Sequence, residues 1–219
     1  MIKIYHLTKS FPAKGLLFDE LALRVAPGEL LFLTGSSGVG KSCLLRIIAG
    51  MLRPDSGQVV VTGRNLETLD ESGLSRLRRE VALVPQEPLL LASRSVAENV
   101  SFALRARGAT AGAAGEASRR WLDNFSISEL SRARPADLSR GEQFKVMLAR
   151  ALAGSPKVLL VDEPAASLDA ESLGAALRLI AEENSRGMTV VVTAKDGKPP
   201  GLQAPRAVEL EKGKAVERP

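Results

Sequence analysis

The chain has 219 residues, of which 45% are hydrophobic, so it can bury the core of one domain made of two subdomains. Its single cysteine excludes a disulfide within the chain, and its single histidine leaves no Cys/His cluster, so any bound metal should have oxygen ligands. A net charge of +5 from scattered residues and an aromatic content of only 4% argue against a nucleic-acid partner.

No stretch of the sequence approaches the roughly 18 uninterrupted apolar residues of a membrane span. The first residues also lack the basic and then apolar pattern of a secretory signal. We therefore expect a protein that is cytoplasmic or bound at the surface of a membrane.

Apolar residues nearly alternate over residues 2–7 and 16–25, which predicts two edge strands. A Pro-Gly-Glu turn then leads into residues 30–34, which are expected to form a buried strand. Residues 42–49 are apolar on a helical period, and a glycine and a proline after them end the predicted helix. Further short strands are predicted at 59–61 and 81–84.

Residues 94–183 are rich in Ala, Leu, Arg and Glu and should be helical, apart from one apolar strand at 158–161. This predicts a helical insertion between the strands of the core. Within it, residues 107–115 are rich in glycine and alanine and are expected to form a surface connection. The last core strand is predicted at 189–193, and the proline-containing segment 195–205 should be irregular.

A glycine-rich segment separates the predicted strand at 30–34 from the predicted helix at 42–49. It matches G-x-x-x-x-G-K-[ST], in which glycines let successive backbone N–H groups curl around phosphate oxygens at a helix N-terminus. Its lysine would reach the β- and γ-phosphates of ATP, and the hydroxyl that follows suits Mg²⁺. A plain glycine turn is the alternative, which the flanking strand and helix disfavour. The loop consists of Gly35, Ser36, Ser37, Gly38, Val39, Gly40, Lys41 and Ser42.

The apolar residues 158–161 end in two carboxylates, Asp162 and Glu163, as expected where a buried strand delivers acids to its carboxyl end. Together with the glycine loop, this segment resembles a Walker B motif. In that motif Asp162 would support Mg²⁺, and Glu163 would be the general base that polarises the attacking water. A surface acid at a strand end is the alternative for Glu163.

A third motif, residues 137–143, reads Asp-Leu-Ser-Arg-Gly-Glu-Gln directly before a predicted helix. It resembles the LSGGQ signature, which separates the ATP-binding cassettes of ABC transporters from other P-loop enzymes. The resemblance covers nearly the whole chain. It implies an α/β fold with a P-loop NTPase (RecA-like) core and an antiparallel β subdomain over residues 1–90 and 153–219, and an inserted α-helical subdomain over 91–152.

The resemblance assigns further residues to the nucleotide. Ser139 and the N–H of Gly141 would bind the γ-phosphate held by a second copy, with ordinary helix capping by Ser139 as the alternative. Arg140 stands where the family usually has glycine. Phe11 is placed like the family's adenine-stacking aromatic, although a core phenylalanine is the alternative. Three further nucleotide-binding candidates are Glu142 of the signature, Asp169 of the D-loop, and Cys43. The alternatives for Cys43 are a small side chain that fills space beside the core and a redox-active thiolate. Gln86 of the Q-loop is a candidate catalytic residue and metal ligand.

The family normally presents a histidine to the γ-phosphate after the last core strand, where this chain has Ala194 followed by Lys195. The only histidine, His6, lies on the first predicted strand. Lys195 could supply charge but not a directed hydrogen bond, and it could equally be solvated. We therefore expect retained ATP binding with slow hydrolysis.

Within the family, residues 32–35, the two leucines after Gln86 and residues 96–100 look most like the FtsE and LolD group, with the cell-division cassette FtsE favoured. That group implies an ATP-sandwich homodimer on the cytoplasmic face of the inner membrane. A permease-like membrane subunit would dock around residues 86–99. The alternatives are a subunit of a lipoprotein-releasing or small-solute exporter, a non-hydrolysing ATP-binding module, and a soluble ABC regulator.

Overall fold

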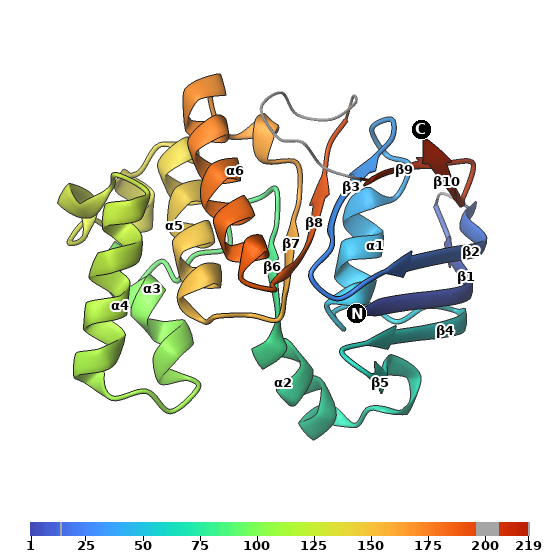
Figure 1. The fold of residues 1–219 in the computed structure, drawn as a ribbon, viewed down its shortest axis with the longest axis horizontal. Coiled ribbons are helices and arrows are strands. Elements are labelled where there is room, and N and C mark those ends of the chain that lie inside the picture. Colours follow the sequence, from blue (N-terminus) through green and yellow to red (C-terminus); the bar gives the residue numbers. More distant parts are fainter. Residues whose placement is uncertain (14, 196–205, 219) are drawn as a thin grey trace.

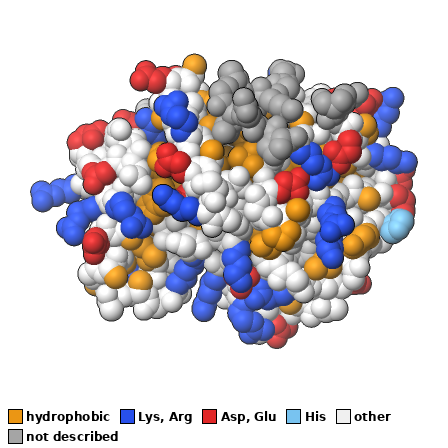
Figure 2. Space-filling model, viewed as in Figure 1, with side chains coloured by type: hydrophobic (Ala, Val, Ile, Leu, Met, Phe, Trp, Pro, Cys, Tyr) orange, Lys and Arg blue, Asp and Glu red, His pale blue; other side chains and the backbone are white. Residues whose placement is uncertain are grey.

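The computed structural model describes residues 1–13, 15–195 and 206–218 of the chain. Its strands form two sheets, and helices pack on both faces of the larger one (Figure 1). No helix within these ranges is long and apolar enough to cross a membrane. Positive and negative side chains are scattered over the face seen in Figure 2, as the sequence pattern predicts.

The larger sheet has six strands in the order β10-β9-β3-β8-β7-β6. Neighbouring strands are parallel except for the hairpin of β9 and β10. Its central strands β3, β7 and β8 are fully buried and apolar apart from threonines at the ends of β3 and β8, as parallel strands covered on both faces require. The six strands are β3 (Leu30–Thr34), β6 (Val81–Val84), β7 (Val158–Val161), β8 (Thr189–Thr193), β9 (Arg206–Glu211) and β10 (Lys214–Arg218).

The smaller sheet is antiparallel and has the order β2-β1-β4-β5. Its strands are β1 (Ile2–Phe11), β2 (Gly15–Val25), β4 (Ser56–Val61) and β5 (Arg64–Asn65). The prediction of an edge strand is wrong for β1, which pairs with β2 on one side and β4 on the other. The alternation in its sequence reports that one face of the sheet is buried, and it carries no information on position within the sheet.

Side chains that alternate along the large sheet enter two separate cores. Leu30 and Phe32 of β3 face a core formed with the helical part of the chain, whereas Leu31 and Leu33 face a core formed with α1 and the small sheet. In Figure 1, α5 and α6 therefore lie on one side of the sheet and α1 on the other. Because both faces of the sheet are packed against a core, the positions of its strand ends are fixed.

Six α-helices lie within the described residues, and α3, α4 and α5 pack together at one end of the molecule (Figure 1). The α-helices are α1 (Lys41–Ile48), α2 (Glu71–Glu80), α3 (Val96–Arg105), α4 (Ala111–Asn124), α5 (Arg140–Ala153) and α6 (Ala170–Ser185). Short 3-10 turns cover Leu66–Thr68, Ser128–Leu130, Pro135–Asp137 and Pro164–Ala166.

The expected surface connection at 107–115 is wrong in its second half, where residues 111–115 form the first turns of α4. Thr110 starts this helix because its hydroxyl accepts a hydrogen bond from the backbone N–H of Ala113. The cap and the helix-forming alanines outweigh the cost of the two glycines. Of the expected irregular segment 195–205, residues 196–205 lie outside the described residues.

Candidate functional site

The glycine loop joins the end of β3 to the start of α1, as predicted. Gly35, Gly38 and Gly40 have φ angles of 139°, 81° and 113°, a region that side chains disfavour. A Cβ on Gly35 would also lie 2.6 Å from the carbonyl oxygen of Leu210, and one on Gly40 would lie 2.7 Å from the ring of Phe18. Backbone conformation and space therefore both require glycine at Gly35 and Gly40.

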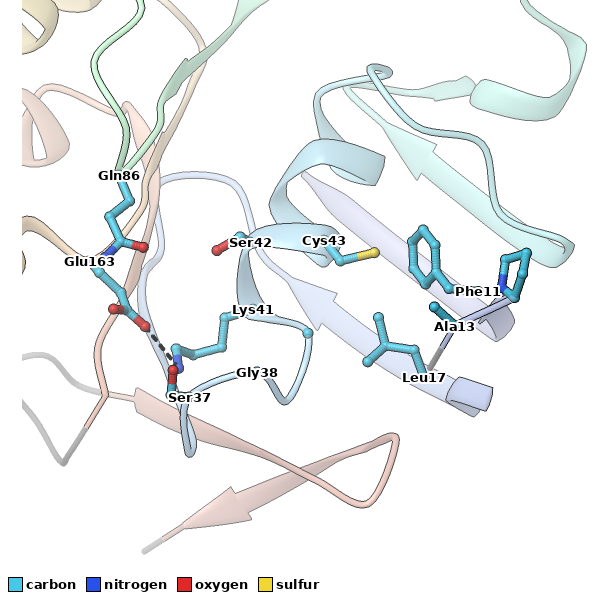
Figure 3. Close-up of a pocket in the computed structure, with 12 residues that line it drawn as sticks. Phe11, Ala13, Leu17, Ser37, Gly38, Lys41, Ser42, Cys43, Gln86 and Glu163 are labelled. Carbon is cyan, nitrogen blue, oxygen red and sulfur yellow. Dashed lines mark ion pairs between the residues drawn. The ribbon is translucent and has the colours of Figure 1, made fainter. Parts of the chain in front are cut away.

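Lys41, the first residue of α1, is only 3% exposed. Its ammonium donates hydrogen bonds to the carbonyl oxygens of Gly35, at 2.6 Å, and of Ser36, at 3.1 Å. It also forms an ion pair with Glu163, with 3.0 Å between Nζ and Oε1 (Figure 3). The buried charge of Lys41 is thus fully compensated by protein oxygens, as a buried ammonium requires.

The two acids lie at the carboxyl end of β7, beside the end of β8. Thr193, the last residue of β8, donates from Oγ1 to Oδ1 of Asp162 at 2.8 Å and accepts from the backbone N–H of Glu163 at the same distance. Glu163 has a φ of 44°, which is uncommon for a residue other than glycine. Thr193 therefore supports both the buried Asp162 and the unusual backbone that aims Glu163 at Lys41.

A cavity of about 540 Å³ lies between the glycine loop, the end of β1, and the residues after β6 and β7. Figure 3 shows an apolar end at Phe11 and Leu17, and an opposite end where Ser42, Gln86 and Glu163 converge. The twelve lining residues are Phe11, Pro12, Ala13, Leu17, Ser37, Gly38, Gly40, Lys41, Ser42, Cys43, Gln86 and Glu163.

Nine of these lining residues are sequence candidates, and the cavity brings them together from four separate segments of the chain. Phe11 is half-buried and belongs to neither apolar core, so the alternative of a core phenylalanine is wrong. The sequence interpretation missed Pro12, Ala13 and Leu17 as well as Thr193. Neighbouring ends of parallel strands were the available signal for Thr193, because β7 and β8 deliver their last residues to one edge.

Other candidates shape the site without lining the cavity. Gly35, Ser36 and Val39 belong to the loop, and Asp162 lies behind Glu163 with only 4% exposure.

Cys43 lines the cavity and also packs on the core, and burial raises the pKa of its thiol. That shift disfavours the thiolate that a redox role would need.

The signature and D-loop candidates lie at helix N-termini, outside the cavity lining. Ser139 caps α5 in a capping box, accepting from the N–H of Glu142 at 3.3 Å while its own N–H donates to the Glu142 carboxylate at 2.7 Å. Hydrogen bonds from Ser139 hold the pKa of Glu142 below its usual value. Asp169 caps α6 by accepting from the N–H of Ser172. Gly141 is in close contact with residues 167–169, which resemble the D-loop, because an added Cβ would lie 3.2 Å from the carbonyl oxygen of Ser167.

Arg140 forms an ion pair with Glu87, with 2.9 Å between its guanidinium nitrogen and a carboxylate oxygen. Both side chains are more than half exposed. The contact joins the start of α5 to the segment directly after Gln86, so the substituted signature position and the Q-loop are linked within one chain.

The residues present fit a magnesium nucleotide. The cavity is within the roughly 300–1,000 Å³ of small-molecule sites, and the left-handed glycines turn the loop at the N-terminus of α1, where anions bind. Among the described residues, no group of three or more His, Cys, Asp and Glu could hold a metal by itself. A metal here would therefore need the hydroxyl of Ser42 and oxygens of the bound phosphates.

Comparisons with known proteins agree with this geometry. Residues 18–166 match the family model described as ABC transporter. The methionine import ATP-binding protein MetN of Mesorhizobium japonicum is 36% identical over 201 residues, which cover 91% of this chain and 55% of that protein. The cell division ATP-binding protein FtsE of Escherichia coli (strain K12) is also 36% identical over 200 residues, covering 90% of this chain and 88% of that protein.

Among solved structures, the dimeric post-hydrolysis state of the ATP-binding cassette MJ0796, bound to ADP and Pi, has a TM-score of 0.90 and 28% identity. It covers 100% of this chain and 98% of that one. This likeness confirms the expected P-loop α/β fold. The chain spans only 55% of the first MetN relative and 61% of a second, from Rhizobium meliloti.

Proposed function

The chain belongs to the ABC transporter family, whose cassettes are ATPases, and from that membership we propose that its cavity binds ATP with Mg²⁺ and hydrolyses it. The observation that carries the proposal is the meeting of Lys41 and Glu163 across one cavity, 3.0 Å apart. One is the lysine of the glycine loop after β3, and the other is an acid at the end of β7, which is separated from β3 by β8 in the sheet.

In this proposal the residues divide the work along the cavity. Lys41 leaves Glu163 and the loop carbonyls to bind the β- and γ-phosphates, and the loop N–H groups hold the phosphate oxygens. Ser42 would be a ligand of Mg²⁺ with Gln86 and Asp162 supporting it, and the metal would supply positive charge to the phosphates. Glu163, once released from Lys41, accepts a proton from the attacking water. Phe11 stacks on the adenine.

Ser139, Gly141, Glu142 and Asp169 act on the ATP of a second copy in the proposed sandwich homodimer. Their position supports this, because they lie at helix N-termini that do not line the cavity of their own chain. We also propose that residues 91–152 move as a helical subdomain relative to the rest of the cassette.

Hydrolysis is slow because Ala194 replaces the histidine that the family presents to the γ-phosphate after the last core strand. Ala194 has no polar side-chain atom, and its backbone N–H is engaged with the carbonyl oxygen of Leu33 at 3.1 Å. No side chain at this position can therefore donate to the γ-phosphate during the reaction. His6 cannot replace it, because it forms an exposed contact with Glu20 on the small sheet.

A single-turnover measurement of phosphate release tests the rate, with the Ala194→His variant beside the wild type. We expect slow release from the wild type and at least about a tenfold increase in the variant, since one directed donor to a developing charge has effects of this size. Brisk wild-type turnover that the variant leaves unchanged contradicts the proposal. ATP that binds and is never hydrolysed would favour the alternative of a non-hydrolysing module.

For the cellular role we propose an FtsE-like cassette at the cytoplasmic face of the inner membrane. A permease-like subunit docks around residues 86–99, where Leu89 is 63% exposed. The 36% identity to FtsE over 200 residues supports this choice, although MetN is equally similar over the matched residues. A lipoprotein-releasing or small-solute exporter subunit is the second candidate, because substrate identity depends on the membrane subunit.

Purification from membranes of the source cells in the presence of ATP distinguishes these roles. The bait is the Glu163→Gln variant, which should hold the ATP-bound state, and a Leu89→Asp version of it is the docking control. A cell-division membrane protein that is lost with Leu89→Asp supports the proposal. A solute or lipoprotein permease on the same surface overturns the FtsE-like role and leaves the ATPase assignment intact.

A further inference from the structure

The turn after α1 is tied to the end of β1 by one carboxylate. Oδ1 of Asp55 accepts from the ammonium of Lys9 at 2.6 Å, and Oδ2 accepts from the backbone N–H of Ser10 at 2.7 Å. The backbone N–H of Asp55 donates in return to the carbonyl oxygen of Thr8 at 3.0 Å. Three consecutive residues of β1 are thus fixed just before Phe11. The hydrogen bonds from Lys9 and Ser10 also hold the pKa of Asp55 below its ordinary value, so its carboxylate is charged at neutral pH.

Lys9 is placed unusually for a lysine. Its side chain is only 13% exposed, and its ammonium lies 5.3 Å from the centroid of the Phe11 ring, within the range of a cation–π contact. Phe11 lines the cavity, whereas Lys9 does not. The cation therefore contacts the ring without occupying the space that a bound base would fill.

Phe11 needs support of this kind because of where it lies. It is the last residue of β1 and is only half-buried, and among the described residues it belongs to neither apolar core. Beyond it, Pro12 and Ala13 form a turn at the mouth of the cavity. A ring at the end of a strand can hold a bound base only if its backbone and its orientation are both restrained.

We propose that Lys9 and Asp55 are positioning residues that hold the Phe11 ring as the stacking platform for the base of the nucleotide. Asp55 fixes the backbone at Ser10 and the ammonium of Lys9, and Lys9 fixes the ring through its charge. The inference rests on the proposed function, since it presupposes a nucleotide whose phosphates lie at Lys41. It adds that the base end of the site depends on Asp55, which lies 46 positions after Lys9 in the sequence.

The test compares two probes by calorimetry, Mg·ATP and Mg·tripolyphosphate, which share the phosphate chain but differ in the nucleoside. The variants are Lys9→Met, which keeps length and removes charge, Lys9→Arg, which keeps the cation, and Asp55→Asn. Lys3→Met, on the exposed side of the same strand, controls for the loss of one positive charge. A thermal melt of each variant checks that it is folded at the temperature of the titration.

We expect Lys9→Met to bind Mg·ATP about 3- to 10-fold more weakly, the size of a partly desolvated cation–π contact, with unchanged affinity for Mg·tripolyphosphate. Asp55→Asn should show the same selective loss of affinity for Mg·ATP. Lys9→Arg, which keeps the cation, should lose at most half as much affinity as Lys9→Met. Equal losses for both probes, or no loss in a folded Lys9→Met variant, overturn the inference. Wild-type protein that binds neither probe instead overturns the proposed function on which the inference rests.

Discussion

The phosphate-loop end and the signature end of this cassette are built in different ways. At the loop, Lys41 and Asp162 are almost fully buried, and Thr193 and Glu163 link them through short hydrogen bonds and an ion pair. At the signature, the hydrogen bonds of Ser139 are made only within its own helix cap. The first half of the site is therefore organised by contacts within one chain, whereas we expect the second half to bind the nucleotide of another copy.

Replacement of the proposed base should give the largest effect at the organised end. Glu163→Gln keeps the size of the side chain and removes its proton affinity, so phosphate release should fall about 10²- to 10⁴-fold. ATP affinity should be kept or increased, because Lys41 no longer has a charged partner to leave. Filter binding and phosphate release measure both quantities. A variant with normal turnover would remove Glu163 from catalysis.

The support behind the acids should give the next largest effect. Thr193→Val keeps the shape of the side chain but leaves Asp162 and the N–H of Glu163 without a partner, costing about 1–3 kcal/mol of the free energy of unfolding. Urea unfolding measures this loss. The matched control is Thr34→Val at the end of β3, where the hydroxyl makes one longer bond of 3.4 Å to Val208. Equal losses at both positions would contradict the supporting role of Thr193.

The signature cap should separate stability from binding. Ser139→Ala should cost about 1 kcal/mol of the free energy of unfolding, the usual value of an N-cap, and Thr110→Ala at the start of α4 should cost about the same. Monomer affinity for ATP should not change in either variant, since neither residue lines the cavity. Only Ser139→Ala should slow hydrolysis at protein concentrations that favour dimers. Weaker ATP binding by monomeric Ser139→Ala would show that the two ends are not independent.

The exposed pair of Arg140 and Glu87 should give the smallest effect. A double-mutant cycle with Arg140→Ala and Glu87→Ala, measured by urea unfolding, should give a coupling energy of about 0.2–1 kcal/mol. Coupling should fall in about 0.5 M salt because solvated charges are screened. A larger coupling that resists salt would mean that the signature end is organised in the single chain as well.

The sequence predicted the organised end because its signals are local. Glycines at fixed spacing report a loop that only glycine can form, and two acids after an apolar run report a strand end. Thr193 and Asp55 were missed because each acts on a partner at least 30 positions away, through strand register and a turn that no local pattern encodes. The resemblance to a family supplied the signature residues, whose positions in one chain do not by themselves reveal a ligand.

The secondary structure shows the same limit. The core strands were predicted at their observed positions because they are apolar except for threonines at the ends of β3 and β8. Helix α2 was not predicted, since it buries little beyond Leu74 and Leu77 and owes its start to the Asp70 cap. The β9 and β10 hairpin was also missed. Its pairing with β3 depends on parallel contacts with a strand more than 170 residues earlier, as in the pair of Leu31 and Arg206.

The ion pair of Lys41 and Glu163 also determines the charge balance of ligand binding. The charge of the lysine is neutralised by the carboxylate of Glu163, 3.0 Å away. A triphosphate that takes Lys41 leaves the freed carboxylate beside an anionic ligand, with Asp162 directly behind it. A divalent cation bound with the triphosphate would neutralise part of this negative charge. Omitting Mg²⁺ should therefore weaken ATP binding more in the wild type than in Glu163→Gln, which titrations with and without EDTA can measure.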